Sequence, residues 1–280
     1  MIEDFLSEKH KRKRKKRRQF FWVAVVIVIV IVIVIVAWIF IWSPVFRLKQ
    51  IVIQGENTVP SSTVASLLQE NLAQNNGFAL KLLGAGNMLA WPDAVVSSEL
   101  ASVPQVASLT VTKNYWYHTV TATVAEREPF AIWCAMPSLD ASGDPEGEEF
   151  CYWFDNTGTM FADAFDTEGN AIFAVHDYAE GAATGTAALG SKILPDFFVP
   201  NLISILNVLK QSGLNVKEIA LEDLSLEQVN VSTYDGPTIY FSLRFPSDVD
   251  LPVLQSLMAK PGFDNLQYVD FTVENRAFYK

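Results

Sequence analysis

The clearest pattern in the chain is an apolar run of 23 residues without a charge, from Phe20 to Trp42. As an α-helix rising about 1.5 Å per residue, the run would be about 34 Å long, which matches the hydrocarbon core of a bilayer. Alternating Val and Ile favour a strand in water, but lipid requires every backbone group to be satisfied within the segment, which a lone strand cannot do. The pattern therefore predicts a helix that spans the lipid bilayer through residues 20–42. Trp22, Trp38 and Trp42 fit the interfacial belts at its two ends.

The charges on either side of this run predict its orientation. Nine Lys and Arg residues lie between Lys9 and Arg18, whereas only Arg47 and Lys49 follow closely after the run. Because basic residues stay on the cytoplasmic side, residues 1–19 are expected to be a basic cytoplasmic tail and the rest to be extracytoplasmic. A cleaved signal peptide fits less well, since the run is too long and no small-x-small site follows it.

The remaining chain is acidic. The tail has nine basic residues and three acidic ones, Glu3, Asp4 and Glu8, so its net charge is +6. Because the net charge of the whole chain is −10, the other 261 residues carry a net charge of −16. A folded part with this charge lacks the basic face that neutralises phosphates, and we expect no nucleic-acid partner for it. Composition alone would permit a nucleic-acid-binding tail at the N-terminus. The basic residues lie directly before the apolar run, however, which favours a role in orienting the membrane helix.

Beyond the membrane, the pattern changes between periods of two and 3.6 residues. Residues 46–54 alternate as a strand, and a helix is expected from Pro60, with Val64, Leu67, Leu68 and Leu72 at helical spacing. A second short helix is expected over 94–101, followed by strands over 106–113 and 119–126. The predicted order over residues 46–128 is β-α-α-β-β.

Residues 129–280 are expected to form a second domain, rich in strands. Helical spacing over 197–212 and 251–260 predicts two helices. The strands are expected at 130–135, 150–154, 216–221, 228–232, 239–245 and, closing the chain, 265–279. Together the patterns predict an α+β protein whose second domain is a mixed or antiparallel β domain with helices on one side.

Leu48–Asn57 is a strand pattern that ends in a glycine turn, Val103–Val106 leads into the next strand, and Val120–Pro129 is a strand pattern that closes with Glu-Arg-x-Pro. These segments resemble the first strand and glycine turn, the approach to the second strand, and the third strand of the FtsQ/DivIB family of bacterial cell-division proteins. Trp153–Phe161 resembles the opening of its β domain, and Tyr268–Asp270 with Asn275–Arg276 its terminal strand. Lys113, Tyr117 and Thr272 depart from the family's arginine, proline and arginine.

The resemblance implies a polypeptide-transport-associated (POTRA) domain over residues 46–128, followed by the family's β domain over 129–280. It also implies a single-pass protein of the cell membrane at the division septum, which scaffolds other divisome proteins. Its β domain would recruit FtsB-like and FtsL-like partners, and its POTRA-like part would contact other divisome members near the membrane.

The last strand is the expected partner-binding surface. A terminal strand can lie at a sheet edge, where its free N–H and C=O groups accept another chain as an added strand. The side chains expected to give specificity are Tyr268, Phe271, Val273, Asn275, Arg276 and Phe278, although strict alternation would turn about half of them into the core.

No catalytic, cofactor or metal site is expected. His10, His118 and His176 have no metal-ligand spacing and are expected at the surface, and the nucleophile-elbow, phosphate-loop and zinc-protease motifs are lacking. Asp155-Asn-Thr-Gly158 is interrupted by an extra Asn relative to the Asp-Thr-Gly of aspartic proteases, and a turn in which Asp155 or Asn156 accepts backbone N–H groups is the simpler interpretation.

Cys134 and Cys151 are the two cysteines. They flank an acidic loop between two apolar segments, so a hairpin would bring the sulfurs side by side. A disulfide would require a location outside the cytoplasm, and the sequence leaves a bridge and two free thiols equally open.

Two other functions remain open from the sequence. A POTRA-containing chaperone or secretion component would normally carry further POTRA copies or a membrane β-barrel. A membrane-anchored cell-wall enzyme or glycan-binding protein would need a constellation of carboxylates or histidines, and none is evident in the sequence.

Overall fold

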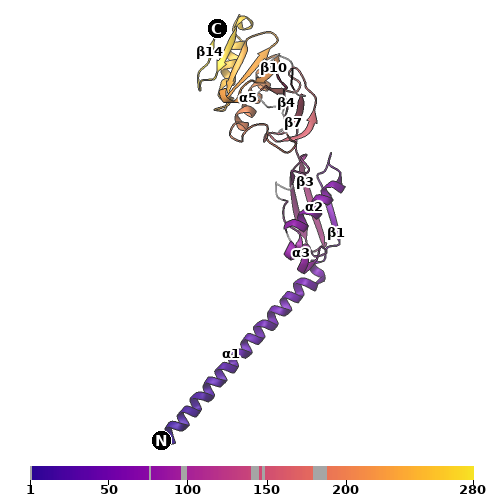
Figure 1. The fold of residues 1–280 in the computed structure, drawn as a ribbon, viewed down its shortest axis with the longest axis vertical. Helices are drawn as coiled ribbons and strands as arrows, with labels where there is room; N and C mark the ends of the chain where they lie inside the picture. The colour runs from indigo at the N-terminus through magenta and orange to yellow at the C-terminus, as the bar shows by residue number, and fades with distance from the viewer. Residues whose placement is uncertain (1, 76, 96–99, 140–144, 147–148, 179–187) are drawn as a thin grey trace. The chain divides into compact units, whose positions relative to one another are not determined.

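The computed structural model describes the chain except for residues 1, 76, 96–99, 140–144, 147–148 and 179–187 (Figure 1). The described residues form a mixed α+β fold with one long N-terminal helix, so the predicted fold class is confirmed at that level. They divide into two compact units. The first unit comprises Met1–Glu56, Pro60–Val95 and Leu109–Val124, and the second comprises Asn57–Val59, Val96–Ser108 and Ala125–Lys280.

Helix α1 (Ile2–Trp42) contains the predicted membrane segment. Within it, Phe20–Trp42 has a mean hydropathy of 3.7 and is not buried, and in the described part of the chain it is the one helix long and apolar enough to cross a membrane. The β-branched residues are helical here despite their strand propensity. A helix satisfies its backbone N–H and C=O groups internally, which is the property that a bilayer requires. The 3₁₀ turn η1 (Pro44–Phe46) follows it.

The sheet of the first unit has the strand order β1–β3–β2. Its strands are β1 (Gln50–Gln54), β2 (Val106–Asn114) and β3 (Thr119–Glu126). β1 runs parallel to β3, and the two remain in register along the whole of β1. Buried Val120, Ala122 and Val124 alternate along β3 with more exposed residues, as expected of a strand with one face on a core. The strands predicted over 106–113 and 119–126 are confirmed. The strand predicted over 46–54 is confirmed for residues 50–54 only, since Phe46 belongs to the 3₁₀ turn η1.

The helices of the first unit are α2 (Ser61–Asn75) and α3 (Gly77–Leu83), followed by the 3₁₀ turn η2 (Met88–Ala90). α2 buries the four apolar residues whose spacing predicted it. α3 was missed because seven residues are too few to show a helical period. Of the helix predicted over 94–101, residues 96–99 lie outside the described residues, and Ala94 forms a β-bridge with Thr110 instead.

Gly55 ends β1 in a turn that only glycine fits. Its φ of +88° lies in the left-handed region, and a Cβ at this position would lie 2.3 Å from the carbonyl oxygen of Val124. The close approach of the turn to β3 therefore requires a residue without a side chain.

The Glu126-Arg127 pair of the family-like motif makes two structural contacts within the second unit. The Glu126 carboxylate accepts the backbone N–H groups of Asn57, Thr58 and Val59 at 2.7–3.0 Å. Burial alone would raise the pKa of Glu126, but hydrogen bonds from the Thr58 hydroxyl and from these three N–H groups outweigh it and lower the pKa to about 2. The Arg127 guanidinium donates to the carbonyl of Pro104 and forms an ion pair with Asp155.

The second unit is built on a nine-stranded sheet with the order β14-β13-β12-β11-β10-β9-β4-β7-β8. Its strands, in chain order, are β4 (Ala131–Ala135), β7 (Phe150–Phe154), β8 (Met160–Ala164), β9 (Ala174–Asp177), β10 (Val216–Leu221), β11 (Gln228–Thr233), β12 (Thr238–Ser242), β13 (Tyr268–Phe271) and β14 (Phe278–Tyr279). The sheet is mixed, since β4 and β9, β9 and β10, and β12 and β13 pair in parallel. A separate two-stranded sheet joins β5 (Ser138–Leu139) to β6 (Pro145–Glu146).

Two α-helices contribute to the core of this unit. They are α5 (Val199–Ser212) and α6 (Leu251–Met258), and the 3₁₀ turns are η3 (Leu224–Leu226), η4 (Asp248–Asp250) and η5 (Phe263–Asn265). The core joins Leu202, Ile205, Leu206 and Leu209 of α5 and Leu254 of α6 to the inward side chains of the sheet, among them Val231, Phe241, Val269 and Phe271. The two helices predicted in this region are confirmed.

The single closing strand predicted over 265–279 is wrong. The segment forms two strands, β13 and β14, joined by a turn. Asp270 Oδ1 accepts from the N–H and hydroxyl of Thr272, and Asn275 adopts the left-handed φ of 58°. These local bonds reverse the chain, so β14 returns antiparallel to β13. β13 therefore has neighbours on both sides, and β14 is the edge of the sheet.

Candidate partner-binding edge

The outer side of β14 is the open backbone edge of the second unit. β14 pairs with β13 through Val269↔Tyr279 and Asp270↔Phe278. The N–H of Lys280 donates to the carbonyl of Tyr268 in β13, and its C=O accepts the N–H of Gln267, the residue before β13. Because groups that face a neighbour alternate along an antiparallel strand, the N–H and C=O of Tyr279 point away from β13. Among the described residues, no strand pairs with this outer side.

The six residues predicted to bind a partner do not share one environment. Val273 is 45% exposed and Phe278 46%, and Asn275 and Arg276 are also exposed. Tyr268 is half-buried. Phe271 is wrong as a surface residue: it is 1% exposed and stacks on Phe241 with 5.5 Å between ring centroids. It belongs to the core, because it lies on the face of β13 that packs against the helices.

Tyr279, which the sequence prediction omitted, completes the edge. Its ring is 51% exposed and lies 5.4 Å from Nζ of Lys260. Phe278 alternates with it and shares the other face of the sheet with Tyr268 and Tyr240, whose rings are 6.3 Å apart. An added strand would therefore meet aromatic side chains on both of its faces. The sequence prediction missed Tyr279 because it treated residues 265–279 as one strand. The turn before β14 changes which side chains share a face.

The opposite edge of the same sheet is partly covered. Met160, the first residue of β8, donates its N–H to Ser191 and accepts the N–H of Gly190 through its C=O, at 2.9 and 2.7 Å. Thr159 forms a bridge with Lys192 beside it. Covering an edge in this way prevents pairing with another chain. The two edges thus differ: the start of β8 is covered, whereas the outer side of β14 pairs with no strand among the described residues.

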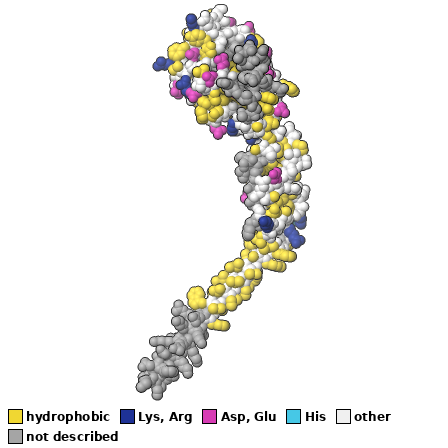
Figure 2. All heavy atoms as spheres, in the orientation of Figure 1, with side chains coloured by type: hydrophobic (Ala, Val, Ile, Leu, Met, Phe, Trp, Pro, Cys, Tyr) yellow, Lys and Arg dark blue, Asp and Glu magenta, His cyan; other side chains and the backbone are white. Residues whose placement is uncertain are grey.

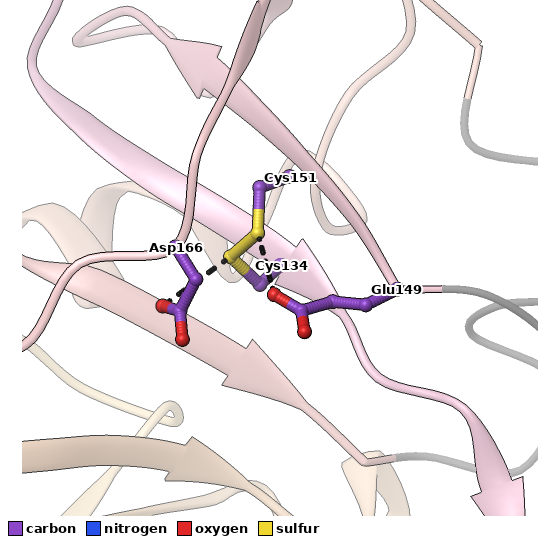
Figure 3. A group of neighbouring side chains, drawn as sticks. All are labelled: Cys134, Glu149, Cys151 and Asp166. Atoms are coloured by element: carbon purple, nitrogen blue, oxygen red, sulfur yellow. Dashed lines mark hydrogen bonds between the residues drawn. A yellow bond between two sulfur atoms is a disulfide. The ribbon is translucent and has the colours of Figure 1, made fainter. Parts of the chain in front are cut away.

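A disulfide joins β4 and β7 on the sheet face opposite the α5 core. Cys134 and Cys151 are directly paired across the two strands, with 4.1 Å between Cα atoms and an S–S distance of 2.00 Å (Figure 3). Asp166 Oδ1 lies 3.9 Å from Sγ of Cys134, and Glu149 Oε1 lies 3.1 Å from Sγ of Cys151. A disulfide sulfur carries no hydrogen, so we regard both as close contacts rather than hydrogen bonds.

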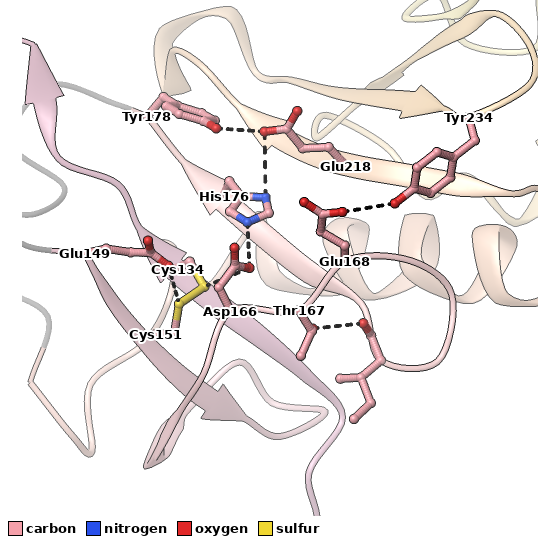
Figure 4. A network of polar contacts seen from close by, with 11 residues as sticks. Cys134, Glu149, Cys151, Asp166, Thr167, Glu168, His176, Tyr178, Glu218 and Tyr234 are labelled. Carbon is pink, nitrogen blue, oxygen red and sulfur yellow. Dashed lines mark hydrogen bonds and ion pairs between the residues drawn. A yellow bond between two sulfur atoms is a disulfide. The ribbon is translucent and has the colours of Figure 1, made fainter. Parts of the chain in front are cut away.

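His176 links this disulfide to a wider polar network (Figure 4). It lies in β9 and is 6% exposed, so the expectation of a surface histidine is wrong for this residue. Its Nε2 lies 2.9 Å from Asp166 Oδ1, and its Nδ1 lies 3.8 Å from Glu218 Oε1. Tyr178 donates to the same oxygen of Glu218 at 2.7 Å. Burial, this hydrogen bond and the neighbouring carboxylates raise the pKa of Tyr178 to about 12.

The chemistry available to this cluster is limited by the S–S bond. Cys134, Cys151, Glu149 and Asp166 place potential ligand atoms within 4.8 Å of one another. Zinc binding by cysteine requires thiolates, and two sulfurs joined to each other supply none. The imidazole of His176 is directed at carboxylates on both sides. The network therefore ties β4, β7, β9 and β10 together on this face.

Asp155 occupies the turn that was predicted for it. Its Oδ1 accepts from the N–H groups of Thr157 and Thr159 at 2.9 and 3.0 Å, and its Oδ2 pairs with Arg127. The interpretation as a capping turn is confirmed. Burial opposes the charged form, but hydrogen bonds from Thr157, Thr159 and Arg127 outweigh it and hold the pKa of Asp155 below its usual value.

Comparison with known protein families finds no family model that matches the chain, and comparison with curated proteins finds no match either.

Proposed function

We propose that this protein is a single-pass membrane scaffold of bacterial cell division, similar in role to the FtsQ/DivIB proteins. Residues 1–19 form its cytoplasmic tail, residues 20–42 cross the cell membrane, and the two folded units lie outside the cytoplasm at the septum. The first unit acts as the POTRA-like domain. The second captures FtsB-like and FtsL-like partners of the divisome.

The observation that carries the proposal is the open outer side of β14. An incoming strand can bond to the N–H and C=O of Tyr279, while Phe278 and Tyr279 offer side chains on its two faces. Val273, Asn275 and Arg276 are exposed in the turn just before β14 and extend the contact beyond the two strand residues. Main-chain bonds supply affinity in such a complex, and the flanking side chains supply specificity.

Two further features support the location and the family role. The Cys134–Cys151 disulfide requires an oxidising compartment, which agrees with a second unit outside the cytoplasm. The family-like Glu126 and Arg127 have clear structural roles, since they hold the 57–59 loop and the Asp155 turn.

Capture of partners by the full-length protein tests this function. Phe278→Glu and Val273→Glu place charge in the exposed hairpin and should abolish co-purification of FtsB-like and FtsL-like proteins from the same bacterium. Phe165→Glu is the matched control, because Phe165 is 90% exposed in the same unit, outside the strands. A fluorescent fusion should also accumulate at the septum. Unchanged capture by both hairpin variants, or a uniform envelope distribution of the fusion, would count against the proposal.

A further inference from the structure

The turn between β2 and β3 exposes two consecutive aromatic side chains, Trp116 and Tyr117, that its own fold does not need. Trp116 is 92% exposed, Tyr117 77% and Tyr115 38%. The backbone of the turn is held by Asn114, whose Oδ1 accepts the N–H groups of Trp116 and Tyr117 at 3.1 and 3.2 Å. Polar side chains would therefore serve the turn equally well. Exposed aromatic patches of this kind mark surfaces that contact something else.

Contacts within the first unit place this turn beside the C-terminal end of α1. The rings of Phe40 and Phe46 stack with centroids 5.4 Å apart, and Phe46 meets Tyr115 edge-on at 5.8 Å. The Tyr115 ring is thus no more than about 11 Å from that of Phe40. Phe40 lies two residues before Trp42, the last residue of the apolar segment. The N–H of Lys49 also bonds to the carbonyl of His118, at 2.8 Å.

Basic side chains surround the same end of the first unit. Arg47 and Lys49 are exposed in the connection from α1 to β1, and Lys81 is exposed in the last turn of α3. Figure 2 shows Lys and Arg side chains gathered where the apolar helix meets the first unit. Lys113, by contrast, pairs with Asp93 at 2.8 Å. Trp and Tyr rings are enriched at the membrane–water interface, at the level of the lipid headgroups, and basic residues there bind anionic headgroups.

We propose that the β2–β3 turn is a second membrane contact: Trp116 and Tyr117 insert at the boundary between lipid headgroups and acyl chains, with Arg47 and Lys49 against anionic headgroups. This inference rests on the proposed membrane anchor and deepens it. A helix alone leaves the first unit free to tilt and rotate above the bilayer. A second contact, made by a rigid hairpin of the sheet, holds the unit in one orientation against the lipid surface.

Photocrosslinking of the full-length protein in lipid nanodiscs tests this contact. The photoreactive residue p-benzoylphenylalanine replaces Trp116, Tyr117, Phe40 or Thr123 in separate variants, in discs containing equal parts of phosphatidylglycerol and phosphatidylcholine. Phe40 is the positive control for the anchor. Thr123 is the matched negative control, because it is exposed on β3 of the same hairpin and lies four residues along the strand from Thr119, about 13 Å away.

The expected result is lipid adducts, identified by mass, at positions 40, 116 and 117, with background yield at 123. Adducts at 40 but only background at 116 and 117 overturn this inference and leave the membrane anchor standing. Background at all four positions overturns the anchor itself. Crosslinks from position 116 or 117 to a second copy of the chain also overturn the inference that this turn contacts lipid. Discs of phosphatidylcholine alone should lower the yield at 116 and 117, and an unchanged yield excludes the role given to Arg47 and Lys49.

Discussion

The ion pair between Arg127 and Asp155 offers a quantitative test of how the second unit is held together. The Asp155 side chain is 7% exposed and the Arg127 side chain 17%. Removing one member of a buried pair typically costs about 3–5 kcal/mol, because the remaining charge loses its partner. Since Arg127 keeps its bond to the carbonyl of Pro104 and some access to water, we expect Asp155→Ala to lower the free energy of unfolding by about 3 kcal/mol.

Asp155→Asn separates the contribution of the ion pair with Arg127 from that of the hydrogen bonds that form the turn. The amide oxygen can still accept the N–H groups of Thr157 and Thr159, so the loss should fall to about 2 kcal/mol, in the range of one hydrogen bond to a charged group. Asp163→Asn is the matched control, because Asp163 is exposed on β8, and it should change stability by less than about 0.5 kcal/mol.

Denaturant unfolding of the full-length protein in detergent micelles measures these differences. Fluorescence of Trp133 and Trp153, which lie on β4 and β7, reports on the second unit. The pKa of Asp155 is lowered from 3.8 in the folded state, so its stabilisation is present above pH 3.8 and is lost as the pH falls through the folded pKa. The difference between the native protein and Asp155→Asn should therefore shrink below about pH 4. A loss below about 1 kcal/mol for Asp155→Ala, or a difference that persists in acid, would refute the reasoning.

Three further predictions concern other parts of the fold. Gly55→Ala should destabilise the first unit by about 2 kcal/mol or more, because alanine is strained at a positive φ and its Cβ would clash with the Val124 carbonyl. An unchanged thermal midpoint of the variant would contradict this. Replacing Cys134 and Cys151 together by Ala should lower the free energy of unfolding by about 3 kcal/mol, since the bridge joins residues 17 apart in the sequence, and an unchanged unfolding midpoint would exclude the bridge as a stabiliser. The carboxyl resonance of Glu126 should titrate near pH 2, so its stabilising contacts are lost as the pH falls from 4.5 to 2; a midpoint near 4.5 shows that they do not form in solution.

The elements predicted from the sequence are those whose burial is periodic over many residues. Val64, Leu67, Leu68 and Leu72 fall on one face of α2, and Val120, Ala122 and Val124 alternate along β3, because each element buries a single face. The turn at Asp155 was also predictable, since its acceptor bonds reach only two and four residues along the chain.

The failures arise where contacts are distant in sequence or where a turn interrupts an alternating pattern. Alternation from Tyr268 onward continues through Val273, which hides the reversal of the chain that follows. The one sequence feature that marks the turn is Asn275, which tolerates a left-handed backbone. The pairing of Arg127 with Asp155 and of His176 with Glu218 depends on the order of strands in the sheet, which local patterns do not determine.

The most direct test of the open edge uses Tyr279→Pro. Proline removes the N–H that faces away from β13 and leaves the bonds of Lys280 to Gln267 and Tyr268 in place, so the sheet is retained while strand addition is blocked. Tyr279→Val is the control, because it removes the ring and keeps the N–H. In co-purification of the full-length protein with FtsB-like and FtsL-like partners, we predict that Tyr279→Pro loses capture and that Tyr279→Val retains a substantial part of it. Equal capture by the proline and valine variants would contradict the proposal that a partner binds by adding a strand to β14.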